Sequence, residues 1–377
     1  MKILKKWANI SIFAGTKYLS LHSSQFIELL YQWHAAIERH LPWKVDTNPY
    51  KIWISEIILQ QTRVEQGTPY YLRFIERFPD VNSLAAAEEQ EVLKLWEGLG
   101  YYSRARNLHA AAKQIVDQFS GEIPSDHRLI LSLKGIGPYT AAAIASFAFG
   151  GVHAVVDGNV IRVLSRIFGI TEAVDTTGGI KQINQLASQL IDRQDPGRYN
   201  QAIMDFGAIQ CLPKNPICLD CPFVKSCFAY KNDMIEQLPF KAKTLTKKSR
   251  FFHYFIIENA GAVLLGRREK QDIWKGLFEF PMIESQGPDL DKTTIFMFLK
   301  DEFGINTAIG APYIKTELKK HLLTHREIHA FVYKFEEKFE LNSKSGTYFF
   351  VPNENLGNFA FPKLLHSIVQ ELMHIQH

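Results

Sequence analysis

The chain has 377 residues, of which 46% are hydrophobic and 22% are charged, close to the average for a globular protein. This composition argues against a disordered, collagenous or coiled-coil protein, and the length predicts two or three domains. The formal net charge of +4 permits a polyanionic partner without requiring one. The sequence has no uninterrupted apolar run of about 18 residues, so a membrane-spanning segment is not expected.

The first 22 residues form a mixed segment in which polar residues interrupt every apolar stretch. A secretory signal needs a continuous apolar stretch and a small-residue cleavage site. We therefore interpret residues 1–22 as a retained N-terminal extension and expect the protein in a reducing cytoplasm.

Residues 23–235 are predicted to form a mostly helical domain. Apolar side chains recur at helical spacing from Phe26 to Ile37, and residues 182–191 and 200–209 show similar patterns. Few stretches in this part alternate as a strand would.

Glu56 is the first candidate for chemistry in chain order. It lies in YKIWISEIILQQ, among isoleucine, leucine and tryptophan. Loss of solvent raises the pKa of a carboxyl group, which makes Glu56 a candidate general acid near neutral pH. The alternative is an exposed carboxylate on an amphipathic helix.

A glycine-rich turn follows in LKGIGPYTA, residues 133–141. Gly135 and Gly137 allow a tight turn, and Pro138 suits the first position of a helix. Backbone N–H groups beside a helix N-terminus favour a phosphate group. With helices on both sides, the string resembles the helix-hairpin-helix motif of base-excision DNA glycosylases; a plain interhelical turn is the alternative.

Asp157 lies in AVVDGNV, directly before a predicted helix. Aspartate in this place is a good N-cap, and the helix dipole favours its ionised form. Glu56 and Asp157 together resemble the carboxyl pair of glycoside cleavage. In such a pair one acid protonates the leaving group, and one anion faces the oxocarbenium-like sugar.

All four cysteines lie within residues 211–227, at Cys211, Cys218, Cys221 and Cys227. Such clustering indicates a metal or cluster site, because a disulfide scaffold spreads its cysteines along the chain. Four thiolates can hold zinc or a [4Fe–4S] cluster, and spacing alone does not decide between them. Placed after the hairpin motif, the spacing resembles the iron–sulfur loop of the endonuclease III superfamily; zinc and free thiols are the alternatives.

The pattern changes after residue 235. Residues 236–250 are predicted to be a basic linker, since five basic and no acidic residues lie within 241–250. Residues 251–377 are predicted to form an α+β domain. It would have two strands joined by a turn at 259–261 and further strands at 327–336 and 346–351, with helices at 292–303 and 361–374.

Together these segments resemble the MutY-type adenine DNA glycosylases over most of residues 23–375. The matching segments include SEIILQQTRV at 55–64, WEGLGYYSRARNLH at 96–109, VVDGNVIRVLSR at 155–166 and NQAIMDFGAIQC at 200–211. The resemblance implies a mostly α helix-hairpin-helix catalytic domain with a [4Fe–4S] loop, followed by an α+β Nudix-like domain. It also implies a monomeric bacterial enzyme at the nucleoid that removes adenine mispaired with 8-oxoguanine or guanine in duplex DNA.

The family assigns roles to three residues. Glu56 matches the acid that protonates adenine N7, Asp157 the carboxylate that stabilises the sugar at C1′, and Tyr139 a hydroxyl residue near that intermediate. Bifunctional relatives carry a lysine at the position of Tyr139 to form a Schiff base. The resemblance therefore implies a monofunctional glycosylase with no efficient lyase step.

Other positions match residues that hold the extruded nucleotide and the duplex. An extruded base leaves a gap in the stack, and Gln61 and Tyr101 match the residues that fill it; a core tyrosine is the alternative for Tyr101. Arg39 and Gln201 match positions that contact adenine. Gly135 and Gly137 belong to the DNA-binding hairpin.

The C-terminal domain resembles a Nudix fold whose catalytic box has decayed. Met297 and Phe298 replace the Arg-Glu pair, and Asp301 stands where a glutamate is expected. Because the hydrolase needs those carboxylates to hold Mg²⁺, we expect recognition without hydrolysis. The family's Phe-Ser-His loop, which reads 8-oxoguanine, matches residues 323–325, where Thr324 keeps the hydroxyl, His325 keeps the imidazole and leucine replaces the aromatic ring.

Three other functions remain open from the sequence. One is a pyrimidine-specific glycosylase and lyase of the endonuclease III type. Another is a Nudix hydrolase of oxidised nucleotides, which the altered box disfavours. The third is a non-catalytic DNA-binding iron–sulfur protein, which the presence of both Glu56 and Asp157 disfavours.

Overall fold

The computed structural model describes residues 16–37, 39–242, 247–305, 313–318, 320–323, 325–335 and 348–374. These residues fall into two compact units. The first unit lies within residues 16–57 and 122–242, and the second within 58–121 and 247–374. Among the described residues, none of the helices combines the length and the apolar character that a bilayer crossing demands.

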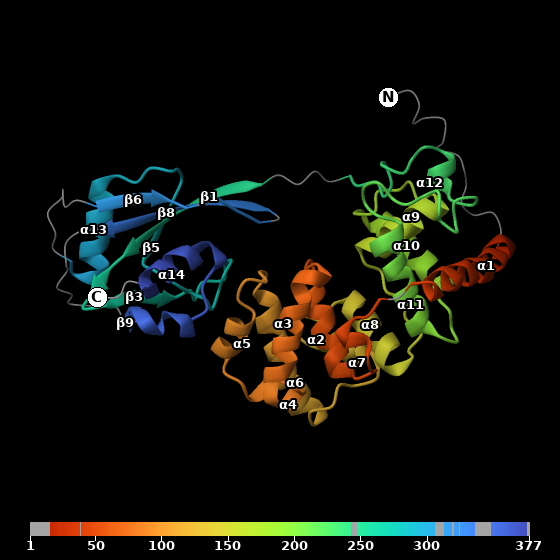
Figure 1. Cartoon of the computed structure of the whole chain (residues 1–377), viewed down its shortest axis with the longest axis horizontal. Helices are drawn as coiled ribbons and strands as arrows, with labels where there is room; N and C mark the ends of the chain where they lie inside the picture. The colour runs from red at the N-terminus through yellow and green to blue at the C-terminus, as the bar shows by residue number, and fades with distance from the viewer. Residues whose placement is uncertain are drawn as a thin grey trace. The chain divides into compact units, whose positions relative to one another are not determined.

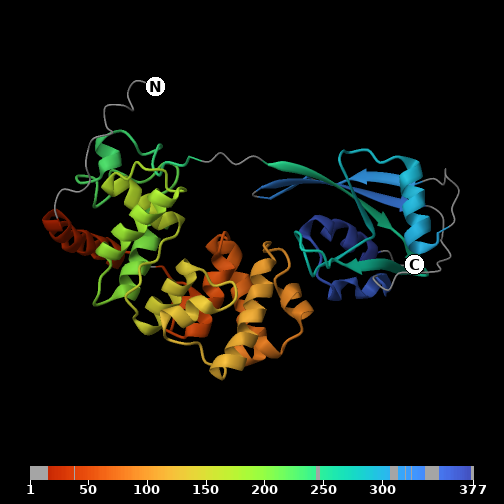
Figure 2. The same cartoon turned by 180° about the vertical axis from the view of Figure 1, so that it is seen from behind.

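The first unit is helical (Figures 1 and 2). Its helices are α1 (Thr16–Ala35), α2 (Pro49–Leu59, which ends in the second unit), α7 (His127–Ser132), α8 (Pro138–Phe149), α9 (Gly158–Phe168), α10 (Thr177–Leu190), α11 (Pro196–Asp205) and α12 (Phe228–Lys231). A 3₁₀ turn (Pro42–Lys44) precedes α2, and a π-helical segment (Phe206–Gln210) continues α11. The helices predicted at 182–191 and 200–209 are thus confirmed, with the last turn of the second wound as a π-helix.

The core of the first unit lies between α1, α9, α10 and α11. Leu30, Leu164, Leu190 and Phe206 have no exposed surface there. Removing this much apolar surface from water stabilises these helices, of which α9 and α11, with 11 and 10 residues, are too short to persist alone. The same packing fixes α9, and therefore the residue at its N-terminus, against α11.

The helices in the N-terminal part of the second unit are α3 (Val64–Arg77), α4 (Val81–Ala86), α5 (Glu89–Leu95) and α6 (Ser103–Phe119). Phe74, Phe78 and Trp96 form a buried aromatic cluster between them, with ring centroids 5.1 to 6.0 Å apart. Two loops flank this group, one before α3 and one before α6.

The C-terminal part of the second unit contains two sheets. Its strands are β1 (Lys248–Ile256), β2 (Glu258–Asn259), β3 (Ala262–Arg267), β4 (Phe278–Glu279), β5 (Met282–Ser285), β6 (Tyr313–Glu317), β7 (His321–Leu322), β8 (Arg326–Phe335) and β9 (Tyr348–Pro352). One sheet has the order β5-β1-β8-β6, with β7 also paired to β8, and β1 runs parallel to β8. The other has the order β2-β3-β4, with β9 paired to β3.

Helix α13 (Lys292–Phe303) packs on these strands (Figure 1). Its Ile295, Leu299 and Phe303 are buried with Phe255 of β1 and Tyr333 of β8. Two 3₁₀ turns (Asn353–Asn358 and Lys363–Leu365) lead to α14 (His366–His374). The predicted fold class, a mostly helical part followed by an α+β part, is confirmed.

Three predicted elements differ in detail. The helix expected at 361–374 begins only at His366, because Pro362 precedes a 3₁₀ turn instead. The strands on either side of residues 259–261 do not form one hairpin. β1 pairs with β5 and β8, and only the two-residue β2 pairs with β3, across a turn in which Ala260 and Gly261 have positive φ.

The predicted linker, 236–250, is folded at both ends. Phe240 accepts a hydrogen bond of 2.9 Å from the backbone of Val174, and the backbone of Ala242 donates one of 2.9 Å to Asp175. At the other end β1 already begins at Lys248. Residues 243–246 lie outside the described residues, and the domain boundaries themselves stay a prediction.

Candidate active site

Glu56 lies on α2, whose apolar residues give it a dry environment. Trp53, Ile57 and Ile58 are buried around the helix, and Glu56 itself is only 8% exposed. The Asn48 side chain accepts the first free N–H groups of this helix and so defines where it begins. Burial raises the pKa of Glu56 to about 7, and the charge of Asp157 adds to this effect. The carboxyl group is therefore partly protonated near neutral pH and can give up that proton.

Tyr139 lies in the first turn of α8, directly after the glycine hairpin. Its hydroxyl donates a hydrogen bond of 2.7 Å to Oε2 of Glu56. Burial, together with the charges of Glu56 and Asp157, raises the pKa of Tyr139 well above its ordinary value. The phenol stays a neutral donor, and it lies within the electrostatic reach of both carboxyl groups.

Asp157 is the N-cap of α9, as the sequence predicts. Its Oδ1 accepts the N–H of Val160 at 2.7 Å, and its Oδ2 accepts the Asn159 side chain at 2.9 Å. Burial raises the pKa of Asp157 above its ordinary value, and these hydrogen bonds oppose that rise without cancelling it. The expectation that the helix dipole alone keeps this group ionised is therefore too simple, because desolvation acts in the opposite direction.

The N-terminus of α9 is held by the buried Arg162. Its guanidinium donates to Asn159 at 2.9 Å, to the carbonyl of Gly207 at 2.6 Å and to the carbonyl of Cys211 at 2.8 Å. Gly207 makes the close approach possible, since a Cβ there would lie 2.6 Å from the Cβ of Asn159. Arg162 thus connects the N-terminal turn of α9, where Asp157 lies, to the π-helical segment and to the start of the cysteine loop.

A second buried carboxylate, Asp205, gathers the two residues predicted to contact adenine. It ends α11 with its side chain 1% exposed, and it pairs with Arg39, with Lys44 at 2.9 Å and with the Gln201 amide at 2.9 Å. His34 lies 3.2 Å from the same carboxylate. Burial alone would raise the pKa of Asp205, but these partners outweigh it and hold the pKa far below its usual range.

Asp205 was not among the residues predicted from the sequence, although Arg39 and Gln201 were. The available signal was a lone acid in the apolar stretch AIMDFGAI, inside the helix predicted at 200–209 and just before the first cysteine. Lys44 links this cluster to Glu56, because its positive charge lowers the pKa of Glu56. The Asp205 cluster and Glu56 are therefore electrostatically linked.

The hairpin forms the turn that its glycines predict. Gly135 has φ +75°, which an L-residue rarely adopts, and Ile136 closes the turn by donating to the carbonyl of Leu133 at 3.1 Å. Gly137 is the N-cap of α8, and a Cβ added there would meet no atom of the described residues within 4 Å. A helix N-terminus that follows such a turn favours an anion.

Gln61 and Tyr101 belong to the second unit and share an unusual backbone. Both are non-glycine residues with positive φ, +54° and +49°, a conformation that costs energy and concentrates at functional sites. Arg104 joins their two loops by donating to the carbonyl of Gln60 at 2.8 Å and to that of Gly100 at 3.3 Å. Tyr101 is 46% exposed, so the alternative of a core tyrosine is wrong.

The four cysteines form no disulfide bond with one another, and they influence one another electrostatically. Burial, together with the charges of Cys211, Cys227 and Cys218, raises the pKa of Cys221 to about 12. Arg166, which is 3% exposed, lies 3.5 Å from the sulfur of Cys211. Sparsely solvated thiols that repel one another and face a buried cation form a donor set that fits an iron–sulfur cluster, which would stabilise their thiolate forms.

The proposed lesion-reading loop lies between β7 and β8. His325 is exposed, and its carbonyl accepts the N–H of Lys248 at 3.1 Å, at the start of β1. Leu323 donates to the carbonyl of Arg326 at 2.8 Å and so closes the turn. Thr324 lies outside the described residues.

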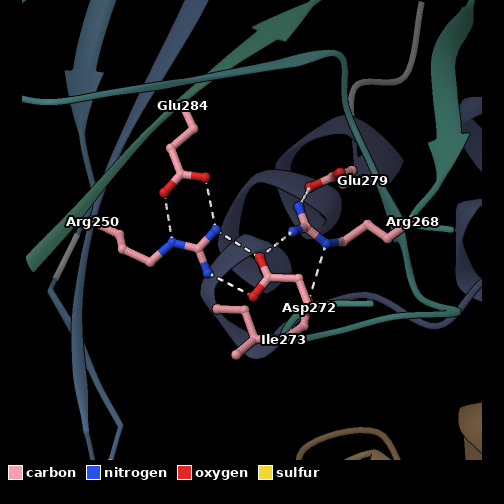
Figure 3. A network of polar contacts seen from close by, with 6 residues as sticks. All are labelled: Arg250, Arg268, Asp272, Ile273, Glu279 and Glu284. Atoms are coloured by element: carbon pink, nitrogen blue, oxygen red, sulfur yellow. Dashed lines mark hydrogen bonds and ion pairs between the residues drawn. The ribbon is translucent and has the colours of Figure 1, made fainter. Parts of the chain in front are cut away.

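The C-terminal domain also carries a network of arginines and carboxylates (Figure 3). Arg250 pairs with Glu284 at 2.6 Å and with Asp272 at 2.6 Å, and Arg268 pairs with Asp272 and Glu279. Every carboxylate drawn in Figure 3 thus has an arginine partner.

Within the part of the chain that the structure describes, no three His, Cys, Asp or Glu side chains are grouped so that they could hold a single metal ion.

A hollow of about 630 Å³ lies elsewhere in the first unit, between α1 and the segment that leads to α11. It is lined by Tyr31, Asp192 and Arg198 among others, and the predicted catalytic residues take no part in it. Tyr31 donates to Asp192 at 2.8 Å and lies under the guanidinium of Arg198. Tyr31, Asp192 and Arg198 are thus already paired with one another, and none of the predicted catalytic residues lines this hollow. We therefore do not place the candidate active site there.

Comparisons with known proteins agree with this arrangement. Residues 54–193 match the HhH-GPD superfamily of base excision DNA repair proteins, and residues 253–371 match the NUDIX domain. The adenine DNA glycosylase of Buchnera aphidicola subsp. Schizaphis graminum is 34% identical over 357 residues, which are 92% of this chain and 98% of the relative. That of Buchnera aphidicola subsp. Baizongia pistaciae is 38% identical over 268 residues, 69% of this chain and 74% of the relative.

Among solved structures, a thermostable thymine-DNA glycosylase is similar in fold, with a TM-score of 0.52 and 29% identity. The match covers 56% of this chain and 97% of that protein. The sequence likeness to the adenine-specific relatives extends through both parts of the chain. The chain therefore belongs to the adenine DNA glycosylase family, with a helix-hairpin-helix part and a C-terminal Nudix-like part.

Proposed function

We propose that the protein removes adenine from duplex DNA in which adenine is mispaired with 8-oxoguanine or guanine. The observation that carries this proposal is the group formed by Glu56, Tyr139 and Asp157. It contains a carboxyl group with a pKa of about 7, a neutral hydroxyl bonded to it and a second carboxyl group within electrostatic reach. Membership of the adenine DNA glycosylase family supports the choice of base.

In the proposed reaction Glu56 donates its proton to N7 of the extruded adenine. Protonation makes adenine a better leaving group, so the bond between N9 and C1′ breaks and the sugar becomes oxocarbenium-like. Asp157, in its ionised form, stabilises that positive charge. Water then adds at C1′, which leaves an abasic site and free adenine. Tyr139 keeps the Glu56 carboxyl oriented by its hydrogen bond, and it offers no amine that could form a Schiff base.

Extrusion of adenine is assigned to residues of both units. Gln61 and Tyr101, on their strained loops, would fill the gap in the stack. Arg39 and Gln201, both held by Asp205, would contact the base. The hairpin with Gly135 and Gly137 would bind a phosphate of the backbone.

Recognition of the opposite base is assigned to the C-terminal domain. Thr324 and His325 would contact 8-oxoguanine with a hydroxyl and an imidazole, and Leu323 would offer apolar contact without a stacking ring. We expect this domain to bind and not to hydrolyse. The enzyme is expected to act as a monomer, at the nucleoid of a bacterial cytoplasm.

Cys211, Cys218, Cys221 and Cys227 are proposed to hold a [4Fe–4S] cluster. When bound, the cluster would tie the cysteine loop to α9, and it has no assigned redox step. Purified protein should be yellow-brown and contain about four irons per chain, as expected for such a cluster. A colourless protein with stoichiometric zinc would contradict the assignment.

The test of the proposed function is a single-turnover glycosylase assay on duplexes with adenine opposite 8-oxoguanine, guanine, cytosine or thymine. We expect release opposite the first two. Efficient borohydride trapping of a covalent adduct with DNA would instead favour the pyrimidine-specific glycosylase and lyase. Release of pyrophosphate from 8-oxo-dGTP would favour the nucleotide hydrolase.

A further inference from the structure

Inside the second unit, the C-terminal domain is fastened to α5 and α6 through its main chain. Lys94 donates to the carbonyl of Phe359 at 2.8 Å, and Gln90 donates to that of Gly276 at 2.8 Å. Arg106 donates to the carbonyl of Lys275 at 2.5 Å. Because main-chain groups have fixed positions in the domain, such contacts hold it more rigidly than pairs of flexible surface charges would.

The peptide groups of Phe361 lie at the centre of this attachment. The N–H of Phe361 donates to Oε1 of Glu97 at 2.8 Å, and its carbonyl accepts the hydroxyl of Tyr102 at 3.4 Å. Phe361 is 1% exposed and Tyr102 is 4% exposed. A backbone group buried to this degree loses stability if its partner is removed, because water cannot replace it.

Glu97 is ionised where it receives these hydrogen bonds. Burial raises its pKa, but the neighbouring His366 and the hydrogen bonds from Lys94 and the Phe361 amide outweigh burial and bring the pKa below its ordinary value. Lys94 lies 2.7 Å from Oε2, and His366 lies 3.4 Å from Oε1. Hydrogen bonds to a charged acceptor are stronger than neutral ones, which makes Glu97 the main attachment point.

Glu97 and Tyr102 also lie at the two ends of the loop that carries Tyr101. Glu97 precedes Gly98, and Tyr102 follows Tyr101 in the chain. The N–H of Gly98 donates to the Tyr102 hydroxyl at 3.1 Å, so this hydroxyl binds the loop and the carbonyl of Phe361 at once. Three residues of the loop, Gly98, Gly100 and Tyr101, have positive φ.

The loop has little freedom to change shape by itself. The hydroxyl of Tyr70 donates to the carbonyl of Glu97 at 2.9 Å, and a Cβ on Gly98 would lie 2.5 Å from that hydroxyl. The indole of Trp96 donates to the carbonyl of Gly100 at 3.1 Å. A displacement of the C-terminal domain at Phe361 would therefore act directly on the backbone on both sides of Tyr101.

We propose that Glu97 and Tyr102 are positioning residues that couple the C-terminal domain to the loop of Tyr101. Through these two residues, the contact between the domain and the base opposite adenine is coupled to the insertion of Tyr101 into the base stack. This inference rests on the proposed function, because it assigns Tyr101 and the C-terminal domain the roles given there. Glu97 and Tyr102 touch neither the adenine nor the opposite base.

The first test compares single-turnover release of adenine opposite 8-oxoguanine and opposite guanine. Glu97→Ala and Tyr102→Phe should each lower the ratio of the two rates roughly fivefold or more, the size of a typical coupling between sites. Their rates opposite guanine should stay within about twofold of wild type, a split that general loss of folding would not produce. Glu97→Gln keeps an oxygen that can accept from Phe361 and should restore most of the ratio. An unchanged ratio in both Glu97→Ala and Tyr102→Phe overturns the proposal.

Glu91→Ala is the matched control. Glu91 lies on α5 with Gln90 and Lys94, but its side chain is 36% exposed and pairs with Arg77 on α3. Loss of such a surface pair changes little. The ratio in Glu91→Ala should equal that of wild type, and a loss as large as that in Glu97→Ala would overturn the proposal.

A second measurement separates failure of the coupling from failure of the proposed function. Hydrogen exchange of the full chain without DNA should become faster in Glu97→Ala both at residues 98–102 and at 359–366, and Glu91→Ala should change neither segment. Faster exchange at 359–366 alone would overturn the coupling. If wild type releases no adenine, the proposed function fails by itself, and the exchange result still decides whether Glu97 joins the two segments.

Discussion

The proposed catalytic group, which is Glu56, Tyr139 and Asp157, and the network in Figure 3 contain the same kind of carboxyl group in two different settings. Glu56 accepts its hydrogen bond from a neutral phenol, and burial raises its pKa to about 7. Asp272 and Glu284 instead face Arg250, and their pKa values lie below the ordinary ones. The comparison shows that an arginine partner lowers the pKa of these partly exposed carboxyl groups, whereas burial beside a neutral donor raises that of Glu56. At Glu279, which is more deeply buried, desolvation raises the pKa despite the pairing with Arg268.

Asp205 shows the same contrast inside the first unit. It is as buried as Glu56, yet His34, Lys44 and Arg39 hold its pKa far below the usual range. Neighbouring charge, and not burial alone, therefore decides which acid can act as a proton donor.

The largest expected effect follows from removing the acidic proton of Glu56. Glu56→Gln should slow single-turnover release of adenine about 10³-fold or more, since general acids contribute roughly 10²- to 10⁴-fold. Binding of the duplex, measured by fluorescence anisotropy, should stay close to wild type because the side chain keeps its size. Glu65→Gln, on α3, is a control that should leave the rate unchanged. Release by Glu56→Gln at the wild-type rate would contradict the role of Glu56.

The same variant has an expected effect on stability. The pKa of Glu56 rises from 4.5 to about 7 on folding, so the folded chain binds this proton more tightly than the unfolded chain. Its contribution to stability is present below pH 4.5 and is lost as pH rises through about 7. Glu56→Gln should therefore raise the unfolding temperature at pH 8 more than at pH 5. An equal change at both values would show that the carboxyl group is not held protonated by the fold.

Asp157→Asn should slow release by about 10²- to 10³-fold, similar to loss of another group that stabilises charge in a transition state. Asparagine is as good an N-cap as aspartate, so the unfolding temperature should change little. Asp126→Asn is the matched control, because Asp126 caps α7 with an exposed carboxylate. A large loss of stability in Asp157→Asn, without a loss of rate, would leave Asp157 only its capping role.

Asp205→Asn should weaken the first unit by about 3–5 kcal/mol, because it leaves Arg39 and Lys44 without their shared anion. It should also shift the pH profile. With Asp205 neutral, the positive charge of Lys44 acts on Glu56 without compensation and lowers its pKa. The rate of adenine release should then begin to fall at a lower pH than in wild type. A profile that shifts to higher pH would contradict the link between the Asp205 cluster and Glu56.

The smallest expected effect belongs to the network in Figure 3. Arg250→Ala should destabilise the C-terminal domain by about 2 kcal/mol, because its side chain is only 12% exposed and it pairs with two carboxylates. Release of adenine opposite guanine should hardly change. Arg77→Ala breaks an exposed pair and should cost about 0.5 kcal/mol or less. Equal losses of stability in the two variants would show that the network is no stronger than a surface pair.

Much of the catalytic group could be predicted from the sequence, because each member lies in a local pattern with a physical meaning. Apolar neighbours predict a raised pKa for Glu56, and the place of Asp157 before a helix predicts an N-cap. The structure confirms both of these. Their catalytic roles stay predictions.

The missed features depend on contacts far apart in the chain. Asp205 meets Arg39 and Lys44 across more than 160 residues, and no local pattern announces those partners. Likewise, β1 lies in a different sheet from β3 because it pairs with β8, and the residues of β1 alone do not predict that pairing. The coupling at Phe361 depends on main-chain groups, which carry no sequence signal at all.

The most direct test of the central claim is the pH dependence of single-turnover adenine release by wild type, on one duplex with adenine opposite 8-oxoguanine. Because the reacting form carries a proton on Glu56, the rate should be highest below pH 7 and fall about tenfold for each pH unit above it. The midpoint should lie near the pKa of about 7 that burial gives to Glu56. A rate that stays constant from about pH 6 to 9, or that rises with pH, would contradict the account.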